Sequence, residues 1–270
     1  MMNDYLQQTA IRIRKRILSM CVKAGTGHVT SSFSCVELLA ALYYGGVLRH
    51  DPNRPEWSYR DRFILSKGQA SPALYAVLAD RGYFPDEWLD GFAQAGGRMG
   101  VHLQKSIPGA EITCGSLGQG FGLAVGMALA AKMDGKKYRV YTLLGDGELY
   151  EGSIYETMLF SSHHKLNNLI AIVDRNGLSV MDYTENIIRL EPIESKWEAF
   201  GWKTQRIDGH DINALLIAFN DIKCCLPDGP TVIIAETIKG YPIKEVEGRA
   251  LWHGVAPSEE VGQRWMEELG

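Results

Sequence analysis

The sequence predicts a doubly wound α/β fold, in which a mostly parallel sheet carries helices on both faces. Three short apolar runs, bounded by polar or turn residues, have the composition of strands buried on both sides: residues 139–144, 169–173 and 231–236. Segments with helical spacing separate these runs, and this alternation is typical of a parallel sheet. With 270 residues and no repeat or long linker, the chain is expected to form one domain over residues 1–270.

The expected helices follow from apolar residues that recur every three or four positions. The first spans residues 6–24. Further helices are expected over residues 36–44, 72–80, 121–132, 153–163 and 211–225. Ser34 and Glu37 have the spacing of a capping box, which predicts a helix start there. The helix over 121–132 is rich in small residues and is expected to pack closely on the sheet.

Composition and charge exclude several classes of protein. Apolar residues make up 46% and charged residues 22%, which is globular usage and excludes a disordered chain. The net charge of −4 offers no general attraction to nucleic acid or to an anionic membrane, so neither partner is expected. The first residues lack the apolar stretch of a secretory leader, no apolar run has the length that spans a membrane, and the five cysteines lack CxxC spacing. We therefore expect a cytoplasmic protein with reduced thiols.

Glycines are concentrated in one part of the chain. Nine of the 29 glycines lie between residues 96 and 126, and Gly145, Gly147 and Gly152 follow soon after. Clusters of this kind mark backbone that turns tightly or approaches a ligand closely. A ligand site is therefore expected around these loops.

Two polar residues follow successive predicted strands. Asp146 lies in a Gly-Asp-Gly turn after residues 139–144, and Asn176 lies just after residues 169–173. Parallel strands end at the same edge of a sheet, where ligands bind in open α/β folds. A carboxylate beside a carboxamide suits a hard cation that also takes phosphate oxygens. An isolated Gly-Asp-Gly would indicate only a tight turn, with Asn176 as a helix cap, but the strand–helix–strand context favours a cation and phosphate site.

The segment over residues 139–177 resembles the thiamine-diphosphate signature of the transketolase family. In that signature a Gly-Asp-Gly is followed about thirty residues later by an asparagine, as here. The resemblance implies that thiamine diphosphate binds this chain. It also implies that Asp146, the Asn176 side chain and the backbone carbonyl of Leu178 hold Mg²⁺ or Ca²⁺.

The resemblance extends to three histidines in glycine-containing loops. The segments KAGTGHV, GVHLQK and LWHG place His28, His102 and His253 at active-site positions of the family. Imidazoles hydrogen-bond to substrate hydroxyls and transfer protons near neutral pH, so the resemblance makes all three catalytic. In contrast, His50 is expected to be a solvated turn residue and His210 a loop or cap residue.

Further cofactor contacts are implied by two glycine-containing segments, CGSLGQG and SKGQA, which resemble TGSLGQG and SKGHA of the family. The implied cofactor-binding residues are Gln69, Gly115, Ser116, Leu117, Gly145, Asp146, Gly147, Asn176 and His253. Gln69 stands where the family commonly has histidine. Glutamine still forms hydrogen bonds but carries no proton charge, so a contact is retained and proton transfer at this position is lost.

The chain ends where ordinary transketolases continue into further domains. The resemblance therefore implies a split transketolase, in which a partner subunit carries the pyrimidine-binding and C-terminal domains. The enzyme would move a two-carbon ketol unit from a ketose or ketose phosphate to an aldose or its phosphate. Two copies of each subunit are expected, with Glu151 and Glu156 in an acidic interface network. The alternatives are a component of another thiamine enzyme, of the 2-oxoacid dehydrogenase or deoxyxylulose-phosphate synthase type, or a non-catalytic homologue.

Overall fold

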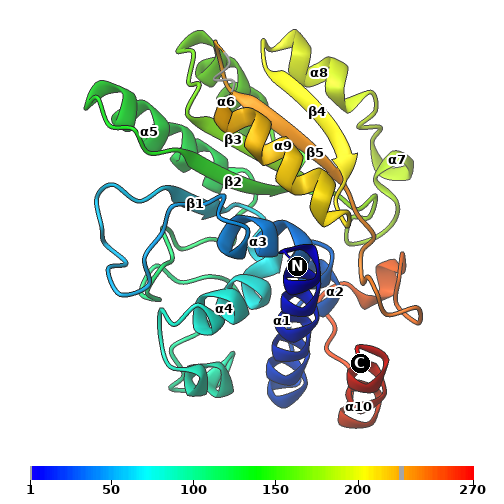
Figure 1. The fold of residues 1–270 in the computed structure, drawn as a ribbon. Coiled ribbons are helices and arrows are strands. Elements are labelled where there is room, and N and C mark those ends of the chain that lie inside the picture. The colour runs from blue at the N-terminus through cyan, green and yellow to red at the C-terminus, as the bar shows by residue number, and fades with distance from the viewer. Residues whose placement is uncertain (1, 225–227) are drawn as a thin grey trace.

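The computed structural model describes residues 2–224 and 228–270, and a parallel five-stranded sheet lies at its centre (Figure 1). Across the sheet the strands are β1 (Arg62–Leu65), β2 (Val140–Gly145), β3 (Leu169–Arg175), β5 (Thr231–Glu236) and β4 (Lys203–Asp208). All neighbouring pairs run parallel. The sheet therefore presents the carboxyl ends of all five strands at one edge.

Helices connect the strands and cover both faces of the sheet. The α-helices are α1 (Met2–Ala24), α2 (Val29–Phe33), α3 (Val36–Tyr44), α4 (Ser71–Asp80), α5 (Gln119–Met133), α6 (Gly152–His163), α7 (Thr184–Ile187), α8 (Ile193–Ala199), α9 (Ile212–Cys224) and α10 (Glu259–Glu268). Short 3₁₀ turns are η1 (Gly68–Ala70), η2 (Asp86–Gly91), η3 (Gly147–Tyr150) and η4 (Ala250–Trp252). No helix in the described residues is long and apolar enough to cross a membrane.

Side chains of β1, β2, β3 and β5 alternate between two apolar layers. Tyr141 and Leu143 of β2 join the layer built with α1, α3, α4 and α9, whereas Val140 and Leu144 join the layer built with α5, α6 and α8. Burial on both faces explains why the central strands read as continuous apolar runs. The doubly wound, mostly parallel fold predicted from the sequence is confirmed.

The two edge strands were not predicted. β4 has the sequence KTQRID, and its residues are exposed or half-buried along its whole length. β1 has four residues and gives too short an apolar run to stand out. Edge strands need less apolar surface than central ones, so composition identifies them poorly.

The capping box predicted from Ser34 and Glu37 is wrong. α3 begins after Cys35, whose side chain makes no capping hydrogen bond. Ser34 Oγ instead donates to Asp174 Oδ2 at 2.7 Å, and the Glu37 carboxylate accepts two hydrogen bonds from Arg14, at 2.6 and 2.7 Å. Both side chains that a local cap would use therefore bond to residues far away in the sequence.

Candidate active site

The loops after β2 and β3 form one end of a cavity at the carboxyl edge of the sheet. Gly145 and Asp174 lie opposite each other in the register of these strands, so both strands end at the same level. The cavity opens to solvent. The predicted site residues that line it are Gln69, Leu117, Gly145, Asp146, Gly147, Asn176, Leu178 and His253. The structure therefore brings together residues that lie as much as 184 positions apart (253 − 69).

Asp146 is the buried carboxylate at this end of the cavity, with 1% of its surface exposed. Its Oδ1 accepts the N–H of Gly147 at 2.8 Å, and its Oδ2 accepts the N–H of Gly177 at 2.6 Å and Nη1 of Arg175 at 3.2 Å. Burial, together with the nearby Asp174 carboxylate, raises the pKa of Asp146, while Arg175 acts against that rise. The carboxylate is held in a fixed orientation, at a position where positive charge stabilises it.

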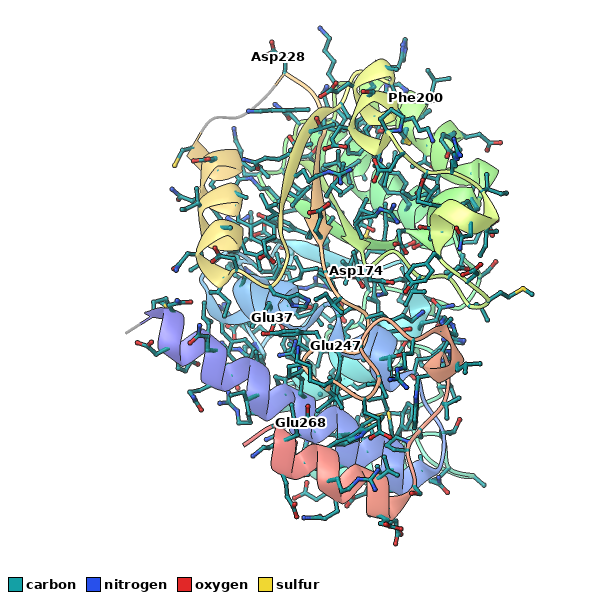
Figure 2. All side chains as sticks on the ribbon, turned by 90° about the vertical axis from the view of Figure 1, so that its right-hand side faces the viewer. Glu37, Asp174, Phe200, Asp228, Glu247 and Glu268 are labelled. Carbon is teal, nitrogen blue, oxygen red and sulfur yellow. The ribbon has the colours of Figure 1, made fainter. Side chains whose placement is uncertain are left out.

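Asn176 is oriented by Asp174, the residue two positions before it. The Asn176 amide Nδ2 donates to the backbone carbonyl and to Oδ2 of Asp174, at 3.4 and 3.3 Å, and its Oδ1 accepts the N–H of Leu178 at 3.2 Å. Asp174 itself is fully buried near the centre of the molecule, as Figure 2 shows. These contacts fix which end of the Asn176 carboxamide is the oxygen, as a cation ligand requires.

Two buried lysines complete the charge balance of the cavity. Lys67 forms an ion pair with Asp174 and donates to the carbonyl of Ser31 at 3.1 Å. Although burial raises the pKa of Asp174, Lys67 and the hydrogen bonds to that carboxylate hold it below its usual value. Lys239, 2% exposed, donates to the carbonyls of Leu178 at 3.4 Å and Ser179 at 3.3 Å. Its burial, with Lys67 nearby, lowers the pKa of Lys239 to about 8.

A third buried acid joins the two glycine loops. Glu148 accepts the N–H groups of Gly118 at 2.8 Å and Gly145 at 3.1 Å, and its burial raises its pKa. Gly118 has φ +78°, and a Cβ there would lie 2.4 Å from Ser153 Oγ, so only glycine fits. Glu148 therefore fixes the spacing between the segment that carries residues 115–118 and the end of β2.

Three histidines lie together beside the cavity, and one of them, His253, lines it. The ring of His28 lies with centroid distances of 5.6 Å from His102 and 5.3 Å from His253. Burial lowers the pKa of His28 to about 4 and that of His253 to about 3, and Lys239 adds to the effect on His253. Both rings are therefore neutral at pH 7. The histidines come from the α1–α2 turn, the loop before α5 and the segment after η4, so folding unites distant parts of the chain.

The other implied residues lie at different distances from this cavity. A Cβ on Gly115 would lie 3.7 Å from the ring of His102, whereas the Ser116 side chain is exposed. Glu151 and Glu156 are exposed and do not line the cavity. In the described part of the chain, no three His, Cys, Asp or Glu side chains are grouped to hold a metal ion. A cation here would need the mixed donor set of carboxylate, carboxamide and backbone carbonyl.

Two further histidines have structural roles. His50 is half-buried rather than solvated, because its ring nitrogens lie 3.0 Å from the Tyr83 hydroxyl and from the Tyr43 carbonyl. His210 lies in the turn after β4, as predicted, and its Nδ1 lies 3.1 Å from Glu37 Oε2. The prediction of a solvated His50 is therefore wrong, since tertiary contacts bury its ring.

Sequence reasoning missed Lys67, Asp174 and Lys239. All three lie at the carboxyl end of a strand: Lys67 follows the end of β1 by two residues, Asp174 is the next-to-last residue of β3, and Lys239 follows the end of β5 by three residues. That position was available as a signal, because charged residues at the carboxyl ends of parallel strands face the ligand crevice. Which partner each charged side chain meets, in contrast, depends on the order of the strands in the sheet, and this order was not predicted from the sequence.

The chain matches the family described as "Transketolase, thiamine diphosphate binding domain" over residues 6–270. It is 43% identical to a 6-deoxy-6-sulfo-D-fructose transketolase subunit of Clostridium sp. (strain MSTE9), covering 98% of this chain and 96% of that protein. It is 36% identical to an apulose-4-phosphate transketolase subunit of Phocaeicola vulgatus, covering 98% and 94%. The solved transketolase of Campylobacter jejuni superimposes with a TM-score of 0.91 at 34% identity, covering 97% of this chain and 42% of that one.

Proposed function

The chain belongs to the transketolase family, and from this premise we propose that it is the diphosphate-binding subunit of a split transketolase. The prediction of thiamine-diphosphate-dependent ketol transfer is confirmed at the level of the family, and two relatives of nearly equal length are named as transketolase subunits. Another type of thiamine enzyme, or a non-catalytic homologue, is not favoured. The chain spans about two fifths of the length of the solved transketolase from Campylobacter jejuni.

The observation that carries the proposal is a single cavity with two different ends. One end is acidic and suits a cation, and we call it the cation end; the other is the histidine end. Asp146 and Asn176 line one part of the cavity, and His253 lines another. The first part would hold a diphosphate through its cation, and the second part offers hydrogen bonds to a substrate. Lys239 connects the ends, since it bonds to the Leu178 carbonyl and lies 2.7 Å from Nδ1 of His253.

The donor atoms at the cation end fit a hard divalent cation. We assign Asp146, the Asn176 side chain and the Leu178 carbonyl as ligands of Mg²⁺ or Ca²⁺, because all three offer oxygen and Asp174 orients the carboxamide. The residues assigned to the cofactor are Gln69, Gly115, Ser116, Leu117, Gly145, Gly147 and His253. When bound, thiamine diphosphate supplies the nucleophilic carbon and the electron sink for cleavage beside a ketose carbonyl.

Hydrogen bonding gives the histidines different proton roles. Lys239 Nζ lies 2.7 Å from Nδ1 of His253, and an ammonium can only donate, so the proton of His253 sits on Nε2. Nδ1 of His102 lies 3.1 Å from the carbonyl of Gly68, which only accepts, so His102 carries its proton on Nδ1. We propose that His253 donates a hydrogen bond to a substrate oxygen and that His102 accepts one, with the neutral ring of His28 in contact with both rings.

Exposed apolar residues of α5 and α6 support an assembly with other chains. Leu123, Leu159 and Phe160 are 49%, 62% and 44% exposed, and Glu151 and Glu156 lie at the start of α6 and within it. We propose that this surface forms an interface in a complex with two copies of this chain. Two partner subunits would supply the pyrimidine-binding and C-terminal domains. The proposal includes a single domain over residues 1–270, sugar or sugar-phosphate substrates and a cytoplasmic location.

Reconstitution tests the proposal. The chain would be mixed with the candidate partner protein, thiamine diphosphate and Mg²⁺, and ketol transfer from a ketose phosphate to an aldose phosphate would be followed by product chromatography. We expect turnover from the mixture and none from either protein by itself. Matched mixtures would contain Asp146→Ala, which should be inactive, or Asp134→Ala, an exposed control at the end of α5. Full turnover by the isolated chain would contradict the split-enzyme proposal.

A further inference from the structure

Arg175, the last residue of β3, contacts the proposed cation ligand Asp146. Its side chain is 9% exposed, and its Nη1 lies 3.2 Å from Asp146 Oδ2. The same Oδ2 already accepts the N–H of Gly177 at 2.6 Å. A carboxylate oxygen has room for about two such partners. A cation that binds Asp146 can still use Oδ1, which accepts only the N–H of Gly147, but it meets the positive charge of Arg175 directly beside the carboxylate.

The guanidinium is held from its other side by the segment around α7. Its Nη1 donates to Thr184 Oγ1 at 2.6 Å, and its Nη2 donates to Glu185 at 2.8 Å and Glu191 at 3.3 Å. Glu191 is shared with Arg206 at 3.0 Å. Arg175 thus lies between the Asp146 carboxylate and two half-exposed acids, and its charge is divided among the three.

We propose that Arg175 is a positioning residue that shares Asp146 with the divalent cation and thereby limits the cation affinity of the site. The inference rests on the proposed function only in taking Asp146 as a cation ligand. Repulsion between a guanidinium and a divalent ion is strong where water is largely excluded. Glu185 and Glu191 weaken that repulsion by drawing the guanidinium charge toward the α7 segment.

The arrangement predicts opposite signs for two kinds of substitution. Arg175→Met removes the competing charge and keeps the aliphatic volume, so it should tighten cation binding. Replacing both Glu185 and Glu191 with glutamine removes the two other negative charges beside Arg175. Its guanidinium then interacts mainly with Asp146, so cation binding should weaken. A purely structural role for Arg175 predicts the reverse for Arg175→Met, because a disordered Asp146 would bind a cation less well. The sign of the change separates the two roles.

The test is a Mn²⁺ titration of the reconstituted complex, with thiamine diphosphate held at a fixed concentration and free Mn²⁺ followed by electron paramagnetic resonance. We expect Arg175→Met to bind Mn²⁺ about tenfold more tightly and the double glutamine variant to bind severalfold more weakly. Arg175→Lys, which keeps the charge, should stay within about threefold of the natural chain. Arg60→Met is the matched control, because Arg60 is 11% exposed in an ion pair with Glu111 before the start of β1.

The outcomes distinguish this inference from the proposed function. If Asp146→Asn leaves Mn²⁺ binding unchanged, or if no Mn²⁺ binding is found, the cation assignment itself is overturned. If Asp146→Asn abolishes binding but Arg175→Met does not tighten it, only the role of Arg175 is overturned. Should Arg175→Met fail to fold, as judged by its thermal midpoint, the double glutamine variant and Arg175→Lys decide the question in the same way.

Discussion

The two ends of the cavity handle charge in different ways. At the cation end, buried carboxylates face buried cations, in the pairs Asp146–Arg175 and Asp174–Lys67. At the histidine end, His28 and His253 are neutral, because burial and nearby lysines lower their pKa values. The first arrangement suits a ligand with permanent charge, such as a diphosphate with its cation. The second suits single hydrogen bonds and proton transfers with a sugar.

The ends also differ in how the chain builds them. The proposed cation ligands come from the ends of two neighbouring strands and the loops that follow them, within residues 145–178. The histidine end needs three segments, around residues 28, 102 and 253, to pack against one another. Substitutions at the cation end should therefore affect cofactor binding and stability, whereas substitutions at the histidine end should affect turnover.

The largest expected effect on cofactor binding is at Asp146. Asp146→Ala removes an oxygen that we assign to the cation and leaves the diphosphate charge poorly neutralised. Thiamine diphosphate affinity of the reconstituted complex should fall at least about 100-fold, the scale of losing a charged, buried interaction. Calorimetric titration measures this, and circular dichroism confirms that the fold persists. An affinity within threefold of the natural complex would show that the cofactor is anchored elsewhere.

Lys67 tests the stability of the cation end. Lys67→Met leaves the fully buried Asp174 without its cation, and breaking one side of a buried ion pair costs about 3–5 kcal/mol. Urea denaturation should show that loss in the free energy of unfolding. The double variant Lys67→Met with Asp174→Asn should recover part of it, since no buried charge is then left unpaired. A loss below about 1 kcal/mol would mean that Ser34 and Thr237 suffice to stabilise the carboxylate.

The two ends also differ in how much of each could be predicted from the sequence. The loops after β2 and β3 were predicted because the register of two parallel strands is enough to place Asp146 near Asn176. The Gly-Asp-Gly and the asparagine about thirty residues later indicate this arrangement in the sequence. Lys67 and Lys239 were missed, because their roles depend on which acid or histidine each meets after folding. The contact among the three histidines was implied by resemblance and not by any spacing in the chain. Strand β4 was missed because its polar residues carry no apolar period.

Turnover should depend on the histidine end. His102→Ala and His253→Ala should each lower kcat/KM about 100-fold or more, the usual scale of acid–base contributions. Thiamine diphosphate affinity should change less for His102→Ala, because His102 does not line the cation end. Steady-state kinetics and calorimetric titration on the same preparations separate the two effects. Near-natural ketol transfer by both variants would remove these histidines from the mechanism.

The neutral histidines also predict how stability responds to acid. The pKa of His28 falls from 6.5 to about 4 on folding, and that of His253 falls to about 3. Between pH 6.5 and 4 the unfolded chain therefore binds protons that the folded chain does not, and the free energy of unfolding decreases as the pH falls. Each histidine contributes at most about 1.4 kcal/mol per pH unit.

Urea denaturation between pH 4 and 7 measures this slope. His28→Asn and His253→Asn should each flatten it, whereas His163→Asn, at the end of α6, should leave it unchanged. A slope that stays the same in both cavity variants would mean that other groups control the acid response.

The smallest expected effect concerns Gln69, which lines the cavity and is half-buried. Glutamine hydrogen-bonds at this position but transfers no proton, and His102 and His253 already provide an acceptor and a donor nearby. Gln69→His should therefore leave thiamine diphosphate affinity within about threefold and change kcat by less than about tenfold, below the usual range of general acid–base effects. Calorimetric titration and steady-state kinetics with several ketose donors would measure both. A change in kcat above 100-fold with only one ketose donor would instead mean that residue 69 selects the substrate. The loop after β1 would then belong to the histidine end of the cavity.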